Sequence, residues 1–97
     1  MKELFVIEIE ERAKIEIADA YDFYENRKKG LGEKFLKAVD GIIEYIKKAP
    51  EGFEEVRFHR QVPMKKFPYV ILYEKVGHTI FIDAVFHTSR NPLNKPK

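Results

Sequence analysis

Apolar positions recur with two different periods in the first half of the chain. Apolar side chains at positions 5, 7 and 9 alternate with Val6, Glu8 and Glu10, which predicts a strand over Glu3–Glu10. From position 11 apolar residues recur every three or four positions, which predicts a helix that ends near Lys28–Lys29, with Gly30 just beyond it. A second apolar stripe predicts a helix over Gly32–Lys48, ended by Pro50. The short link between the stripes predicts an antiparallel helix pair.

The second half has the alternation that is typical of strands. Val56–Val62 is predicted to form one strand that Pro63 closes. Two longer runs, Tyr69–Val76 and Thr79–Phe86, are rich in β-branched and aromatic residues and flank Gly77 and His78, which predicts a hairpin with a type II′ turn. This turn implies a register with the pairs Val76–Thr79, Tyr73–Ile82, Ile71–Ala84 and Tyr69–Phe86.

The hairpin register assigns its side chains to two faces, because side chains alternate along a strand. One face is apolar and predicts the core: Tyr69, Ile71, Tyr73, Ile80, Ile82, Ala84 and Phe86. The other is mixed: Val70, Leu72, Glu74, Val76, Thr79, Phe81, Asp83 and Val85. Such a face is either covered by another loop or strand of the chain, or it receives a partner.

These elements predict an α+β fold in a two-layer sandwich. An N-terminal strand and a helical hairpin precede a three-stranded antiparallel meander that completes the sheet, in the order β-α-α-β-β-β. The length of 97 residues predicts a single domain over 1–97.

Composition narrows the possible functions. Hydrophobic residues make up 44% of the chain, which indicates a folded protein. The absence of cysteine excludes disulfides, Cys-ligated zinc and thiol catalysis. No cofactor motif is present, and none of the three histidines has metal-ligand spacing to another, so we expect no cofactor and no metal. The charged N-terminus does not match a signal peptide, and we expect a cytoplasmic protein with no membrane partner.

Basic residues gather late in the chain, although the net charge is only +2. We expect them near the open end of the hairpin, where they bind phosphates or an acidic partner, or form a solvated rim. Arg57, His59 and Lys66 are candidates for contact with a target or nucleic acid, and His59 is expected to point away from the core. If the protein cleaves RNA, the candidate catalytic residues are Arg60, Lys65, His87 and Arg90, with His87 as general acid or base.

Three segments resemble the RelE/ParE superfamily of type II toxin–antitoxin systems, which includes plasmid stabilisation proteins. The first helix, with Ala18, Tyr21 and Tyr24, is similar to the family's opening helix, and the segment Lys29–Leu36 to its inter-helix turn and second helix. More specific are Lys66–Tyr73, with its Phe-Pro-Tyr start, and Ala84–Pro92, with its Val-Phe-His end, which resemble the hairpin of the ParE-like branch.

The resemblance implies the same small sandwich, a cognate antitoxin as partner and one of two targets. RelE-like members cut messenger RNA on the ribosome, whereas ParE-like members bind DNA gyrase without chemistry of their own. RelE-like ribonucleases carry arginine at the position of Val70, so the sequence favours the non-catalytic gyrase inhibitor. A ribosome-dependent endoribonuclease and an inactive relative that only binds antitoxin stay open as alternatives.

The mixed face of the hairpin provides an expected antitoxin site. Its apolar members Val70, Leu72, Phe81 and Val85 form the floor that an antitoxin segment would cover. The oligomeric state stays open, because the second helix could share its stripe with a symmetry mate in a homodimer or belong to a monomer bound to antitoxin.

Overall fold

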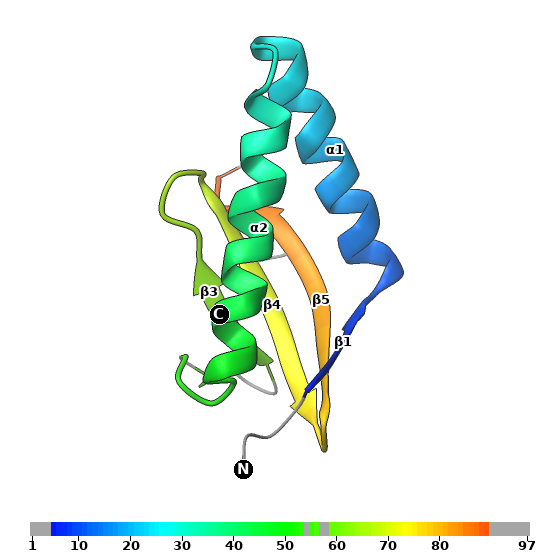
Figure 1. Cartoon of the computed structure of the whole chain (residues 1–97), viewed down its shortest axis with the longest axis vertical. Helices are drawn as coiled ribbons and strands as arrows, with labels where there is room; N and C mark the ends of the chain where they lie inside the picture. The colour runs from blue at the N-terminus through cyan, green and yellow to red at the C-terminus, as the bar shows by residue number, and fades with distance from the viewer. Residues whose placement is uncertain (1–4, 54, 57–58, 90–97) are drawn as a thin grey trace.

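Two helices lie on one face of a five-stranded sheet (Figure 1). The computed structural model describes residues 5–53, 55–56 and 59–89. In chain order the elements are β1 (Val6–Ile9), α1 (Glu11–Arg27), α2 (Leu31–Lys48), β2 (Glu55–Val56), β3 (His59–Pro63), β4 (Tyr69–Val76) and β5 (Thr79–His87). The predicted α+β sandwich is therefore confirmed. Neither helix has the length and apolar composition needed to cross a bilayer.

The sheet has the strand order β1-β5-β4-β3-β2. β3, β4 and β5 form the predicted antiparallel meander, and β1 pairs with β5 in parallel, so the sheet is mixed. The prediction of one strand over 56–62 is wrong, because β2 and β3 pair antiparallel, with Glu55 opposite Arg60. Alternating residues suit a short hairpin as well as a continuous strand, and this pattern cannot distinguish the two.

The β4–β5 hairpin follows the predicted register only near its turn. Gly77 has a φ of 61°, as a turn of this kind requires, and Val76 lies opposite Thr79. Tyr73 pairs with Ile82, but the next residue back, Leu72, pairs with Ala84, which leaves Asp83 as the extra residue of a β-bulge. Beyond this bulge the predicted pairs Ile71–Ala84 and Tyr69–Phe86 are wrong: Ile71 faces Val85, and Tyr69 faces His87.

The bulge exchanges the two faces over the last part of β5. Val85 is fully buried in the core shared with the helices, although the sequence placed it on the mixed face. Ala84 and Phe86 are also buried, but they lie opposite Leu72 and Val70, on the face away from the helices. One extra residue reverses side-chain parity, and no local pattern in β5 announces it.

The core between the layers contains an aromatic cluster at the end of the sheet where β4 begins. Tyr24 of α1, Phe35 of α2, Phe67 and Tyr69 pack with ring centroids 4.9–6.2 Å apart. The Phe-Pro-Tyr start of the hairpin is therefore a packing motif that joins both helices to β4.

Candidate functional site

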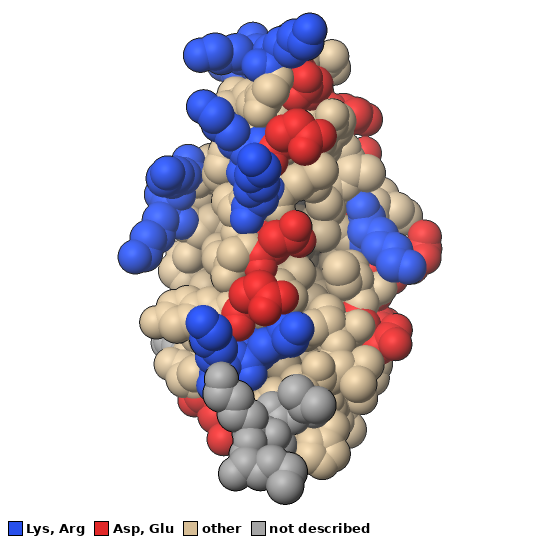
Figure 2. All heavy atoms as spheres, viewed as in Figure 1, with Lys and Arg blue, Asp and Glu red and all other residues tan. Residues whose placement is uncertain are grey.

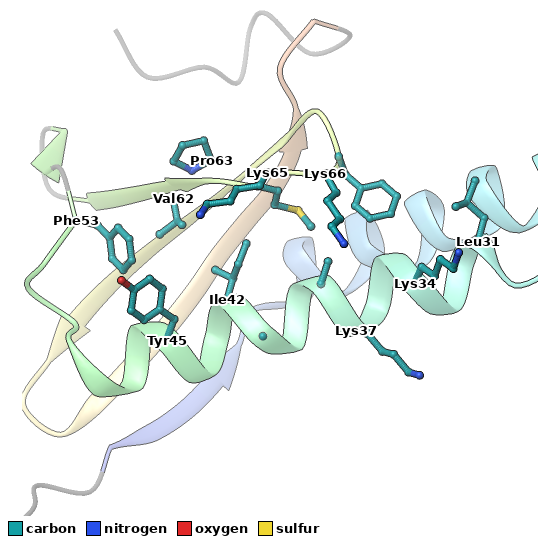
Figure 3. A pocket seen from close by; sticks show the side chains of 14 residues that line it. Leu31, Lys34, Lys37, Ile42, Tyr45, Phe53, Val62, Pro63, Lys65 and Lys66 are labelled. Atoms are coloured by element: carbon teal, nitrogen blue, oxygen red, sulfur yellow. The ribbon is translucent and has the colours of Figure 1, made fainter.

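A long apolar groove lies between α2 and β3 and has a volume of about 970 Å³ (Figure 3). Its walls come from one side of α2, from the loop after α2, and from β3 with the connector to β4. The apolar lining residues are Leu31, Ala38, Ile42, Tyr45, Phe53, Val62, Pro63, Met64 and Phe67. Tyr45 is 60% exposed and contacts Phe53 edge to face at 5.5 Å, so an aromatic pair stands open at one end of the groove.

Lysines surround this apolar floor. Lys34 and Lys37 come from α2, and Lys65 and Lys66 come from the β3–β4 connector, so both walls of the groove carry lysines (Figure 3). All four are exposed, and within the described part of the chain none of them forms an ion pair. Figure 2 shows basic side chains over the upper part of α2 and at the left, over the β3–β4 connector, with acidic ones lower on α2. This groove suits a partner that is apolar on one side and acidic at its edges.

The face of the sheet away from the helices carries a different set of side chains. Val70, Leu72 and Phe81 are half-buried there, so three of the four residues expected to receive an antitoxin share this face. Val85, the fourth, lies in the core on the opposite side. The apolar floor expected on this face therefore loses Val85, while the bulge places Ala84 and Phe86 on this face instead.

Charged groups also meet on that face. His59 points away from the core as predicted, and its Nε2 lies 3.0 Å from Asp83 Oδ2 and 3.8 Å from Glu74 Oε2. Burial, followed by the nearby Glu74 and Glu10 carboxyls, raises the pKa of the Asp83 carboxyl from its ordinary value of 3.8 to about 7. His59 therefore contacts carboxylates of its own sheet, away from the lysines of the groove.

Among the described ribonuclease candidates, Arg60 lies apart from His87. Arg60 donates through Nη1 to the carbonyl oxygens of Phe53 at 2.8 Å and Glu51 at 3.4 Å, so its guanidinium holds the loop after α2. Arg60 pairs with Tyr73 on one side of β4, whereas His87 pairs with Tyr69 on the other side. Four residues of β4 separate them by about 13 Å along the strand direction alone. The expected convergence of Arg60 with His87 is wrong.

His87 and the connector lysines do lie toward the same end of the hairpin. The Thr88 N–H donates to the Pro68 carbonyl at 2.9 Å, which ties the end of β5 to the start of β4 beside Lys65 and Lys66. The His87 ring packs on Tyr69 at 5.2 Å, and its Nδ1 accepts a hydrogen bond from Ser89 N–H at 3.0 Å. The candidates Arg57 and Arg90 lie outside the described residues.

Sequence reasoning missed the groove because the apolar stripe of α2 does not by itself show how much of its width the sheet covers. Only part of that stripe is buried: Phe35, Val39, Ile43 and Ile46. Ile42 and Tyr45 widen the apolar stripe toward Lys34 and Lys37. The width of the stripe is the sequence signal that could have revealed the groove. A stripe wider than one neighbouring surface can cover leaves an apolar wall beside the core.

Comparisons with known proteins agree with this architecture. The family described as "ParE toxin of type II toxin-antitoxin system, parDE" matches residues 7–92. A chain from the solved chromosomal ParDE TA system from P. aeruginosa is similar in fold, with a TM-score of 0.67 and 24% sequence identity. The match covers 89% of this chain and 98% of that one. No curated protein sequence matches the chain.

Proposed function

Because the chain belongs to the ParE toxin family of type II toxin–antitoxin systems, we propose that it inhibits growth by binding DNA gyrase and that a cognate antitoxin neutralises it. The lysine-rimmed apolar groove between α2 and β3 is the observation that carries the second part of this proposal, neutralisation by an antitoxin. The first part, gyrase binding, rests on family membership and on the separation of Arg60 from His87.

A toxin that acts by binding needs no assembled catalytic centre. RNA cleavage requires a base, a cation for the developing charge and an acid, all at one phosphate. Here Arg60 is held by loop carbonyls about 13 Å along the sheet from His87, and the uncharged Val70 lies nearer to that end of β4. This arrangement supports inhibition by binding rather than by cleavage.

The antitoxin segment that fits the groove is an amphipathic one with acidic flanks. Its apolar side chains would cover Ile42, Tyr45 and Phe53, and its carboxylates would face the lysines on both walls. The groove therefore gives the antitoxin both burial of apolar area and charge complementarity.

The target is tested by two parallel assays on the purified chain. One follows supercoiling of relaxed plasmid by DNA gyrase, and the other follows cleavage of messenger RNA on ribosomes. We expect loss of supercoiling and intact message. Message cleavage that disappears in His87→Ala would establish the ribonuclease instead, and no effect in either assay together with normal growth on expression would indicate an inactive relative.

The groove is tested with the protein encoded beside this chain as candidate antitoxin. Tyr45→Ala removes an exposed aromatic anchor, and we expect the complex to weaken by about 30-fold, as for an interface hot spot. Ile15→Ala is the matched control, because Ile15 is 54% exposed on α1, away from the groove. Equal affinities for the two variants would place the antitoxin elsewhere, whatever the toxin's target.

A further inference from the structure

Three side chains with metal-binding atoms meet on the face of the sheet away from the helices. They are His59 from β3, Glu74 from β4 and Asp83 from β5, and one ligand atom of each lies within 4.8 Å of the other two. The His59 Nε2 is 3.0 Å from Asp83 Oδ2 and 3.8 Å from Glu74 Oε2. This imidazole and these two carboxylates converge from three neighbouring strands.

The backbone holds this convergence in place. The pairing of Arg60 with Tyr73 sets His59 beside Glu74 on adjacent strands. The β-bulge leaves Asp83 as the unpaired residue of β5, and bulges re-aim a side chain where a regular strand would not. The three groups therefore depend on sheet register rather than on flexible loops, which favours a defined coordination geometry.

The cluster brings two carboxyl groups together without a lysine or arginine partner among the described residues. Among the described residues His59 is the only basic group that pairs with Glu74 or Asp83. The Asp83 Oδ2 atom is inaccessible to solvent and accepts no hydrogen bond from any described residue, although His59 Nε2 is near it. A buried carboxylate oxygen without a hydrogen bond is costly, and a cation at the cluster would remove that cost.

We propose that His59, Glu74 and Asp83 bind one divalent transition-metal ion, with zinc as the preferred ion. Bonds of about 2.0–2.2 Å from zinc to nitrogen and oxygen place neighbouring ligand atoms roughly 3–3.5 Å apart, close to the spacing of these atoms. The imidazole selects zinc, cobalt or nickel over magnesium, which prefers oxygen ligands alone. His59 and Glu74 are about one-third exposed, so an ion can reach the cluster and keep solvent in its remaining position.

The role of this ion is structural, and it does not depend on the proposed gyrase or antitoxin binding. It would join β3 to β4 and β5 on the face of the sheet opposite α1 and α2. Because β3 also forms one wall of the groove, the ion would stabilise that wall from behind. The sequence predicted no metal, since His59, Glu74 and Asp83 are separated by unrelated intervals and only the sheet brings them together.

The test titrates zinc chloride into the full-length, tag-free protein after treatment with a chelator. We expect one zinc per chain by calorimetry and a melting temperature that rises by about 10 °C when zinc reaches roughly 100 times its Kd. Cobalt should bind at the same site and give visible absorption, and magnesium should give no shift. The absence of both heat and thermal shift with zinc would overturn the proposal.

Variants separate this site from adventitious surface binding. His59→Gln and Glu74→Gln change partly exposed side chains, and each should weaken zinc binding by more than about 10-fold, since even changes outside the ligand shell cost that much. His78→Gln, in the β4–β5 turn, is the matched control and should leave zinc affinity unchanged. Zinc affinity that is unchanged in the first two variants, or lost in the control, would assign the ion to another site.

Discussion

Glu16 of α1 accepts a hydrogen bond from the Val85 N–H of β5 at 2.7 Å, across 69 positions of the chain. β1 covers the outer edge of β5 only from Thr79 to Ile82. Beyond that point the helix carboxylate takes the place of a neighbouring strand. The sheet edge is thus completed by a side chain, which joins the two layers at the point where β1 has ended.

Removing that carboxylate should destabilise the protein. Glu16→Ala leaves the Val85 N–H without its acceptor, and we expect a loss of about 1–3 kcal/mol in the free energy of unfolding. Glu16→Gln keeps an acceptor oxygen and should lose less. Arg12→Ala is the control, because it removes only the exposed ion pair with Glu16 and should cost at most ~0.5 kcal/mol. Urea unfolding measures all three, and equal losses in Arg12→Ala and Glu16→Ala would contradict the prediction.

Two glycines of α2 should respond in opposite directions to alanine. A Cβ on Gly32 would lie 2.8 Å from the Tyr21 ring and 2.9 Å from the Tyr21 carbonyl oxygen, so the helices must move apart, and we expect a loss of about 1–3 kcal/mol. A Cβ on Gly41 meets nothing within 4 Å, and the better helix propensity of alanine should add up to about 1 kcal/mol. Thermal unfolding of the two variants gives the comparison. A stabilised Gly32→Ala would show that the helix contact is looser than this structure has it.

The buried Tyr73 phenol should make stability fall at alkaline pH. Its hydroxyl donates to the Pro50 carbonyl at 2.5 Å, and burial raises the pKa of Tyr73 from 10.0 to about 12. Between pH 10 and about 12 the Tyr73 hydroxyl loses its proton in the unfolded chain but keeps it in the folded chain. The contribution of the raised pKa is therefore complete below pH 10 and lost as the pH rises to about 12.

Tyr73→Phe isolates this effect. At neutral pH the variant should lose about 0.5–1.5 kcal/mol, the usual value of one hydrogen bond. Its deficit relative to the parent protein should shrink between pH 10 and 12, as measured by urea unfolding at each pH. Tyr45→Phe alters an exposed side chain and should stay within about 0.5 kcal/mol of the parent at neutral pH. A deficit that is constant across the alkaline range would refute the link to Tyr73.

If the lysine-rimmed groove receives an acidic antitoxin, its affinity should depend on salt. Lys34→Glu combined with Lys66→Glu places repulsive charges on both walls, and we expect slower association at low ionic strength, with the difference reduced at high salt. Lys14→Glu, on the exposed side of α1, should change the rate little. Stopped-flow binding over a salt series measures this, and a salt-independent defect would point to lost packing instead.

The elements of this fold follow from local patterns in the sequence. The helix pair, the β4–β5 hairpin and the turn glycine Gly77 were all predicted, because period, turn chemistry and helix-ending residues act over a few neighbouring positions. The same holds for the resemblance to the ParE branch, which the match over residues 7–92 confirms. The division into β2 and β3 was missed because alternation alone does not show where one strand ends and the next begins.

The sequence predicted the positions of the candidate site residues only in part. The sequence set His59 on the outer face correctly, but it could not show that Asp83 and Glu74 would be beside it. It also joined Arg60 to His87 in one site, although β4 separates them. Distances between strands depend on register, and a single bulge changes register without a strong local signal.

The sequence by itself therefore determined the helix pair, the β4–β5 hairpin and the family, because each rests on residue types at short spacing. Only the tertiary structure decided which face Val85 occupies, how far the α2 stripe lies open beside β3 and which carboxylates surround His59. The physical reason is that these features arise where distant strands and helices pack, so each depends on a register or a gap that no single segment encodes.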